Sequence, residues 1–227
     1  MNQLALPLQL ADHAVFASFL PTGNESLVSA LQAIADGKAK SGGYCWGTSA
    51  TGKTHLLQAV CERAGDESVY LPMNMLAASS AAILQGLANR RLICIDDIDV
   101  VAGQPDWELA LFDLYNQAVE TGSCLLVSAG AAPRRAGFQL PDLQSRLSQL
   151  PVYQLHSLDE AATRAALQLR ASHRGLDLPD ETAQFLLGRQ RRDMASLYQL
   201  LDQLDAAALR AQRRLTIPFV KQVLDDT

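Results

Sequence analysis

Short apolar runs and helical repeats of apolar residues alternate along the first 155 residues of the chain. Runs such as LICID are apolar along their whole length, which is typical of parallel strands covered on both faces. The predicted strands are residues 44–46, 68–71, 91–95, 123–128 and 152–155. Apolar residues at helical spacing predict helices over residues 53–64, 77–87 and 106–121. Together these patterns predict an α/β domain built on a five-stranded parallel sheet.

The pattern changes after residue 156, where no further strand is indicated and three or four helices follow. Ser157 and Glu160 are spaced as a capping box at the first helix start, and Thr216 with Pro218 marks the last start. The predicted parts are an extended N-terminal peptide at residues 1–12, the α/β domain at 13–156 and a small helical domain at 157–227.

Composition sets limits on the class of protein. With 227 residues, 48% of them hydrophobic and 19% charged, the chain can bury one sizeable core and a small second one. No apolar stretch has the length of a membrane span and the N-terminus lacks the features of a secretory signal, so we expect a cytoplasmic protein. The net charge of -5 argues against strong binding of nucleic acid through the chain's own electrostatics.

The cysteines give no sign of a metal or redox site. Cys45, Cys61, Cys94 and Cys124 stand singly within apolar stretches, without a C-x-x-C pair or a histidine at metal-ligand spacing. We interpret them as reduced core residues. The four histidines are equally dispersed and form no site by themselves.

The sequence GTSATGKT at residues 47–54 matches the phosphate-binding pattern G-x-x-x-x-G-K-[ST], between a predicted strand and a predicted helix. Two glycines let the backbone wrap closely round phosphates, the lysine adds a charge beside the β- and γ-phosphates, and the threonine hydroxyl can ligate magnesium. We expect the chain to bind ATP or ADP with Mg²⁺. The predicted nucleotide-binding residues are Gly47, Ser49, Ala50, Thr51, Gly52, Lys53, Thr54 and His55.

A pair of carboxylates, Asp96 and Asp97, follows directly after the predicted strand at residues 91–95. We expect Asp96, together with Thr54, to hold the magnesium ion, and Asp97 to polarise a water for attack on the γ-phosphate. At the end of the next strand, Ser128 has two interpretations: it orients the attacking water or senses the γ-phosphate, or it is a turn residue.

Arg146, in DLQSRLSQL, lies on a segment with few other charges between the fourth and fifth predicted strands. An arginine that projects into a neighbouring subunit's nucleotide site speeds hydrolysis there by several orders of magnitude. A surface arginine in a local salt bridge is the alternative, and sequence context leaves both open.

The order of these features resembles that of the AAA+ ATPases, in particular the clade of the bacterial replication initiator DnaA. The segments FASFLPTGNESL, GKTHLLQAV, IDDID and LQSRL carry the resemblance. It implies that residues 16–24 help to hold an adenine base. Because the sequence ends at Thr227, shortly after the helical domain, it is more similar to the DnaA-related regulators without a DNA-reading domain; LDQLDAAALRAQRRLTIPFVKQVL also resembles their C-termini.

The N-terminal sequence QLALPL resembles the motif by which replication proteins dock on the DNA polymerase sliding clamp. Pro7 keeps this peptide extended, its leucines suit an apolar cleft and its glutamine amide can fix the register. An N-terminal strand that packs on its own domain is the alternative. The predicted clamp-binding residues are Gln3, Leu4, Leu6, Pro7 and Leu8.

Two positions depart from the initiator pattern. Gly130 stands near the point where initiators carry an acidic residue, and Ala195 stands where they carry a lid arginine, for which Arg191 or Arg192 is a doubtful substitute. Without these groups a site distinguishes ATP from ADP less well. We therefore hypothesise a module that rests with ADP bound and hydrolyses little ATP by itself.

These observations predict a negative regulator of replication initiation. Bound to nucleotide and to the sliding clamp, it would offer Arg146 in trans to the ATP held by DnaA and so stimulate hydrolysis there. The resemblance leaves a homo-oligomer possible, and no membrane partner is expected. The alternatives are a helicase-loader or transposition-type AAA+ ATPase that acts on DNA, and a small-molecule kinase that uses the same loop.

Overall fold

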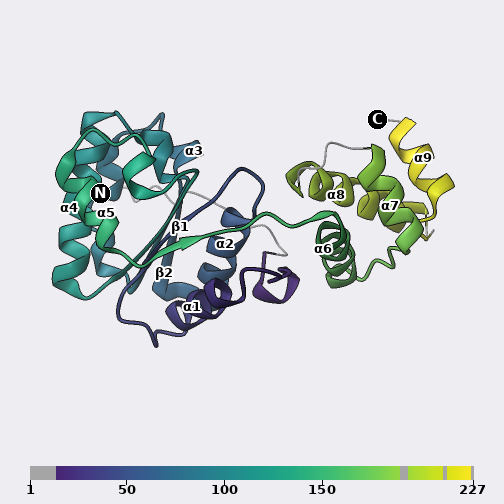
Figure 1. Cartoon of the computed structure of the whole chain (residues 1–227), viewed down its shortest axis with the longest axis horizontal. Coiled ribbons are helices and arrows are strands. Elements are labelled where there is room, and N and C mark those ends of the chain that lie inside the picture. Colours follow the sequence, from purple (N-terminus) through teal and green to yellow (C-terminus); the bar gives the residue numbers. More distant parts are fainter. Residues whose placement is uncertain (1–13, 190–193, 212–213, 226–227) are drawn as a thin grey trace.

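In a computed structural model of the chain (Figure 1), the described residues are 14–189, 194–211 and 214–225. Their strands form one parallel sheet in the order β2-β3-β4-β1-β5, which confirms the predicted fold class. The strand bounds are β1 Gly43–Trp46, β2 Ser68–Pro72, β3 Leu92–Asp96, β4 Cys124–Ala129 and β5 Val152–Gln154. The predicted clamp-binding residues 3–8 lie outside the described residues.

Helices cover both faces of the sheet. Ile93 and Ile95 of β3 point to one face and pack with α4 (Pro105–Thr121) and α5 (Pro141–Gln149). Leu92 and Cys94 point to the other face and pack with α1 (Glu25–Ala35) and α2 (Lys53–Ala64). Successive residues of a strand point to opposite faces, so a strand covered on both faces is apolar at consecutive positions, as residues 92–95 of β3 are. All four cysteines are buried and free, as predicted.

The predicted helix over residues 77–87 is wrong. The structure has the short helix α3 (Met73–Leu76) and two 3-10 turns, Ala81–Leu84 and Leu87–Asn89, in its place. The Ser80 hydroxyl accepts a hydrogen bond from the Ala82 backbone, which competes with helix continuation. Gly86 then adopts a left-handed φ of 77°, which breaks any regular helix. The predicted helices at 53–64 and 106–121 are confirmed, whereas α1 and α5 were not predicted.

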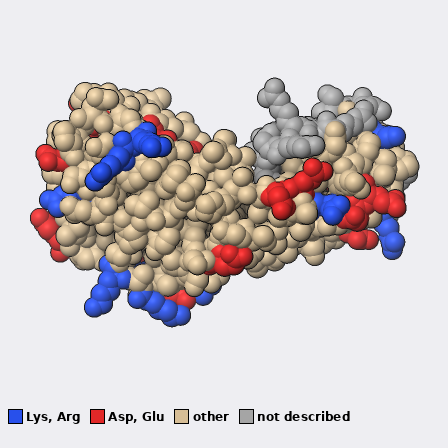
Figure 2. Space-filling view, in the orientation of Figure 1, with Lys and Arg blue, Asp and Glu red and all other residues tan. Residues whose placement is uncertain are grey.

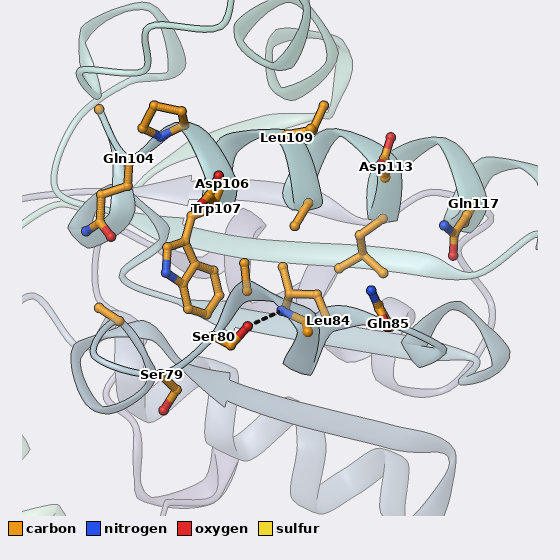
Figure 3. Close-up of a pocket in the computed structure, with 17 residues that line it drawn as sticks. Ser79, Ser80, Leu84, Gln85, Gln104, Asp106, Trp107, Leu109, Asp113 and Gln117 are labelled. Atoms are coloured by element: carbon orange, nitrogen blue, oxygen red, sulfur yellow. Dashed lines mark hydrogen bonds between the residues drawn. The ribbon is translucent and has the colours of Figure 1, made fainter.

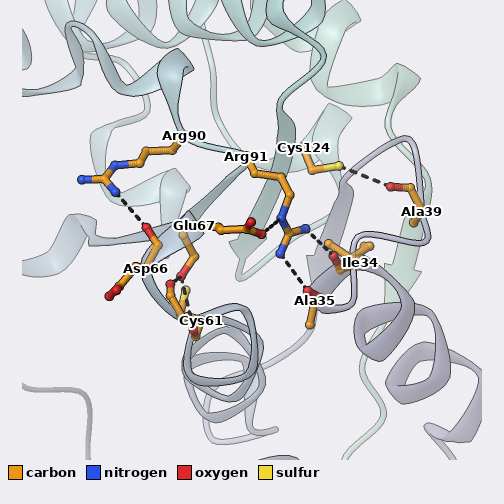
Figure 4. Close-up of polar contacts among 11 residues, drawn as sticks. Ile34, Ala35, Ala39, Cys61, Asp66, Glu67, Arg90, Arg91 and Cys124 are labelled. Carbon is orange, nitrogen blue, oxygen red and sulfur yellow. Dashed lines mark hydrogen bonds and ion pairs between the residues drawn. The ribbon is translucent and has the colours of Figure 1, made fainter.

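Arg91 fastens the α1–α2 layer to the start of β3 (Figure 4). Its guanidinium donates to the carbonyls of Ile34 and Ala35 at the end of α1, at 3.1 and 2.8 Å, and forms an ion pair with Glu67. The cationic side chain therefore satisfies carbonyls at the C-terminus of a helix, where positive charge is favoured. This joint lies at the amino end of β3, away from the loop at residues 47–54.

The helical domain follows β5 through residues 155–159 and has its own apolar core, which includes Leu167, Leu186, Leu201 and Phe219. Asp159, rather than Ser157, caps its first helix, because the Asp159 carboxylate accepts from the Ala162 N–H at 2.8 Å. The predicted Ser157 capping box is therefore wrong, while the last helix starts after Thr216 as predicted. The helices are α6 Glu160–His173, α7 Asp180–Arg189, α8 Met194–Ala211 and α9 Ile217–Asp225.

None of the helices in the described ranges has the length and apolar character needed to cross a bilayer.

Candidate functional site

The predicted phosphate-binding loop connects the end of β1 to the start of α2. Gly52 directly precedes α2 with a φ of 96°, a conformation that glycine adopts without strain. A Cβ on Gly47 would lie 2.8 Å from the carbonyl oxygen of Leu155, so the close approach of these two segments also requires glycine. Ala50 has a φ of 63°, which is uncommon for a residue with a side chain and typical of functional loops. The first turn of α2 thus points its N–H groups into the loop.

The Lys53 side chain lies inside this loop. It is 8% exposed, and its ammonium donates to the carbonyl oxygens of Gly47 and Thr48 at 2.9 and 3.1 Å. Next to it, Thr54 is exposed on the first turn of α2. The loop therefore brings together the Lys53 charge, the positive end of the α2 helix dipole and the exposed residue Thr54.

The two predicted carboxylates lie at the end of β3, and Ser128 of β4 aligns them. Asp96 is 2% exposed and accepts hydrogen bonds from the hydroxyls of Tyr70, at 2.8 Å, and Ser128. The Asp97 N–H donates to the same Ser128 oxygen at 2.9 Å. Ser128 lies inside β4 (Cys124–Ala129), so it is not a turn residue. Its hydroxyl is engaged in fixing the two aspartates.

Burial, followed by the charge of Asp96, raises the pKa of Asp97, and the charge of Lys53 opposes that shift. The charges of Asp96 and Lys53 thus both act on the Asp97 carboxylate. A raised pKa favours proton exchange with a bound water.

Thr54 and Asp96 offer oxygen donors, which suit a hard cation such as Mg²⁺. Within the described ranges, no three His, Cys, Asp or Glu residues gather closely enough to hold a metal ion alone. A magnesium ion at this place would therefore take most of its ligands from phosphate and water oxygens, which is how Mg²⁺ is held in phosphate sites.

A cavity of ≈ 180 Å³ lies beside the loop. Its walls come from three parts of the chain: the segment before α1, the loop itself and the helical domain. Asn24 ties the first part to the segment that leads into the helical domain, because its amide exchanges two hydrogen bonds with the backbone of His156, at 2.9 and 3.2 Å. The residues that line the cavity include Phe19, Leu20, Leu158, Thr163 and Tyr198.

The His55 imidazole is taken up by contacts inside the protein. Nε2 lies 3.0 Å from the Val15 carbonyl oxygen and Nδ1 lies 3.0 Å from the Arg170 guanidinium. Since a guanidinium only donates, Nδ1 accepts and Nε2 carries the proton. Burial lowers the pKa of His55 to about 4, so the ring is neutral at pH 7. His55 therefore joins the segment before α1 to α6 of the helical domain and does not act as a charged group.

This buried histidine predicts an acid sensitivity. The unfolded chain binds a proton at His55 below pH 6.5, whereas the native protein does so only near pH 4, so stability falls as pH drops between these values. At pH 4 this difference in proton binding lowers the free energy of unfolding by about 3 kcal/mol. Urea unfolding of the wild type and His55→Gln at pH 7 and pH 4 measures it. The wild type should lose about 3 kcal/mol more than the variant; equal losses would contradict the assignment.

Arg146 lies on α5, half-buried, with its guanidinium 5.9 Å from the centre of the Tyr115 ring on α4. Among the described residues, none forms an ion pair with it. The local salt bridge considered as the alternative is therefore absent from the described part of the chain. A guanidinium that lies over an aromatic ring without a bound carboxylate keeps its hydrogen-bond donors available.

The two positions that depart from the initiator pattern differ in their surroundings. The Gly130 N–H donates to the Asp99 carboxylate at 2.9 Å, so an acidic group does lie at this point, supplied by another segment. Ala195 lies in the first turn of α8, whereas Arg191 and Arg192 lie outside the described residues.

Three residues at the site were missed by the sequence prediction: Tyr70, Arg170 and Tyr198. Arg170 is 7% exposed and packs over the Tyr198 ring at 3.9 Å, which ties α6 to α8 beside the cavity. The sequence carries one usable signal, a lone arginine on the otherwise apolar face of a helix. The partner of such an arginine depends on tertiary packing.

A wider groove of ≈ 800 Å³ lies apart from the loop, between residues 77–85 and α4 (Figure 3). Leu84 and Trp107 contribute its apolar wall, and Asp106 and Asp113 lie along its α4 side. It shares no residue with the cavity beside the loop.

Known proteins resemble both parts of the chain. Residues 154–224 match the family described as "Hda, lid domain". Domain III of the replication initiation protein DnaA from Thermotoga maritima superposes with a TM-score of 0.77 at 19% identity, over 95% of this chain and 97% of that one. AMPPCP-bound DnaA from Aquifex aeolicus gives 0.67 at 18% identity, over 86% and 65%. The Thermotoga maritima RuvB Holliday junction branch migration motor gives 0.63 at 15% identity, over 88% and 67%.

The strand order, the loop between β1 and α2, the carboxylates after β3 and the helical domain give the chain the fold of an AAA+ module, as in domain III of DnaA. The helical domain, over residues 154–224, is similar to the Hda lid. This confirms the family resemblance found in the sequence.

Proposed function

We propose that this protein is a negative regulator of chromosomal replication initiation, which stimulates hydrolysis of the ATP held by DnaA. The Hda-type lid and the DnaA-like fold support a DnaA-related replication regulator. The observation that carries the proposal is the state of Arg146. Its guanidinium is steadied by the Tyr115 ring and forms no ion pair with a described residue, so it is available to a phosphate outside the chain.

In this proposal the protein's own site holds ADP or ATP. Lys53 and the α2 N-terminus bind the β-phosphate, while Thr54 and Asp96 hold Mg²⁺, which offsets the phosphate charge. The base lies in the cavity of Phe19 and Tyr198, between the segment before α1 and the lid. Bound nucleotide would then set the lid against the α/β domain. The AMPPCP in the Aquifex aeolicus DnaA structure supports a nucleotide at the equivalent place.

Hydrolysis takes place in the partner. Arg146 enters the nucleotide site of a DnaA molecule and stabilises the negative charge that develops on the γ-phosphate oxygens in the transition state. A bidentate guanidinium suits this task because its donors match two phosphate oxygens at once. We assign water activation in the protein's own site to Asp97, and we propose weak or no ATPase activity alone.

Residues 3–8 would dock the module on the DNA polymerase sliding clamp. A variant that lacks residues 1–8 is expected to lose capture by immobilised clamp and clamp-dependent stimulation of DnaA, while its affinity for ADP stays that of the full chain. A pull-down and a hydrolysis assay with DnaA preloaded with labelled ATP, with and without DNA-loaded clamp, measure both. Clamp capture that survives the deletion would favour the loader-type alternative.

Direct action on DNA is less well supported. On the face shown in Figure 2, the basic and acidic side chains of the described residues are scattered and form no continuous basic band. Contact with phosphodiester backbones usually relies on such bands. A helicase-loader or transposition-type ATPase would bind single-stranded DNA and turn over ATP unaided, so low values for both support the regulator.

A further inference from the structure

Glu108 of α4 is a buried carboxylate with an unusual set of partners. It is 2% exposed. One oxygen accepts from the Gly103 N–H at 2.6 Å, and the other accepts from the Leu140 N–H at 2.6 Å. Both oxygens lie 3.0 Å from the Gln139 nitrogen. Two backbone segments more than 30 residues apart in sequence thus converge on one carboxylate.

Buried charges are costly unless they are well compensated. Among the described residues, no lysine or arginine forms an ion pair with Glu108, so backbone N–H groups and the N-terminus of α4 carry the compensation. Charge-assisted hydrogen bonds of this kind are stronger and shorter than neutral ones. The arrangement therefore specifies the path of the backbone at residues 139–140.

That path leads directly into α5. Leu140 is the residue before the helix, which begins at Pro141, and Pro141 has no N–H of its own. The Leu140 N–H is therefore the last backbone donor before α5 to which the Glu108 carboxylate can bind. Glu108 fixes the entry of the helix that carries Arg146.

The same helix α4 also contacts the Arg146 side chain. Tyr115, whose ring underlies the Arg146 guanidinium, is seven residues after Glu108, which is two helical turns or about 10 Å along α4. Leu143 and Leu147 of α5 are buried in the same apolar cluster as Tyr115 of α4. One rigid helix thus sets both where α5 begins and where its arginine rests.

We propose that Glu108 is a positioning residue for Arg146: it holds the start of α5 so that the guanidinium meets the γ-phosphate of the partner. This rests on the proposed function of Arg146 in trans. A displacement of about 1 Å at a catalytic group costs roughly 100-fold in rate. Glu108 therefore governs the maximal stimulated rate, while the contacts that bring the two proteins together remain.

The test is Glu108→Gln, which keeps the shape but replaces one acceptor oxygen by a donor. Whichever way the amide turns, an NH₂ group faces backbone N–H groups on one side. We expect the maximal rate of stimulated hydrolysis of DnaA-bound ATP to fall about tenfold or more. The concentration of this protein that gives half of the maximal rate should change little. Glu108→Asp keeps the charge with a shorter reach and should give an intermediate rate.

Amide hydrogen exchange supplies the structural readout. In E108Q, the protection of the Gln139 and Leu140 amides should be lost, while ADP affinity stays at the wild-type value. Asp113→Asn is the matched control, because Asp113 is an exposed carboxylate of the same helix with no hydrogen bond among the described residues, and it faces the groove of Figure 3. D113N should stimulate as the wild type does.

Arg146→Ala, measured in parallel, separates the two proposals. If R146A stimulates normally, the proposed function is wrong whatever the Glu108 variants do. If R146A is inactive but E108Q, with its Gln139 and Leu140 amides exposed, reaches the wild-type maximal rate, only the positioning role is overturned. Should E108Q fail to fold, E108D decides: a normal maximal rate together with lost protection at residue 140 overturns the inference.

Discussion

Replacing Arg146 by alanine is expected to remove the stimulation of DnaA-bound ATP hydrolysis almost completely. A guanidinium supplied in trans is worth about 10³-fold or more in such reactions, because it neutralises charge that appears only in the transition state. Arg146→Lys should restore little, since a lysine keeps the charge but loses the planar, bidentate donors that match two phosphate oxygens. Single-turnover hydrolysis of labelled ATP on DnaA, at saturating regulator and clamp, measures the effect.

The fold should tolerate this change, because Arg146 is half-buried and takes part in no ion pair within the described residues. Arg135→Ala is the matched control: Arg135 is an exposed arginine of the 3-10 turn Pro133–Arg135, which packs against α5. R135A should change the maximal rate less than about twofold, since screened surface charges contribute little. Retained stimulation by R146A at wild-type clamp capture would refute the role of Arg146.

Replacing Lys53 by alanine should weaken nucleotide binding by about 10- to 150-fold. Lys53 is the only lysine in the loop at residues 47–54, all of which are described. Its ammonium lies inside the loop, and a charge-assisted contact to phosphate contributes about 1.5–3 kcal/mol. Titration calorimetry with ADP, with and without Mg²⁺, gives the affinity. Lys38→Ala, which removes an exposed lysine paired with Asp36, is the control and should bind ADP normally.

A K53A variant that binds ADP with wild-type affinity would show that the loop at residues 47–54 does not hold the phosphates. If K53A loses ADP but still stimulates DnaA fully, the protein's own nucleotide is not needed to place the lid. Loss of both activities would support a nucleotide that sets the shape of the module.

The parts of the site that the sequence predicted are those fixed by local chemistry. The glycine, lysine and threonine of the loop are contiguous, and the carboxylates end an apolar strand, so spacing alone placed them. The helix at 77–87 failed for a related reason: apolar spacing there suggested a helix, but the Ser80 side-chain bond and the left-handed Gly86 act locally against it. Local backbone chemistry outweighed periodicity.

The parts that could not be predicted depend on distant segments. Glu108 reads in sequence as an exposed acidic residue in the first turn of a helix, and its burial follows only from the approach of residues 139–140. Arg170 and His55 meet across 115 positions of sequence. The resemblance to the DnaA clade supplied the general arrangement of sheet and lid, but these individual contacts come from packing.

The hydrogen bond between His55 and the Val15 carbonyl has a consequence for the reach of the proposed clamp tether. Val15 is anchored to the helix that follows the phosphate-binding loop, and only residues 9–14 separate it from Leu8. Seven peptide steps span at most about 25 Å. A module held by so short a linker explores a small volume, in which its effective concentration is in the millimolar range. Weak affinity for a DnaA molecule beside the clamp would then suffice. A longer linker of glycine and serine would lower this effective concentration without altering any contact.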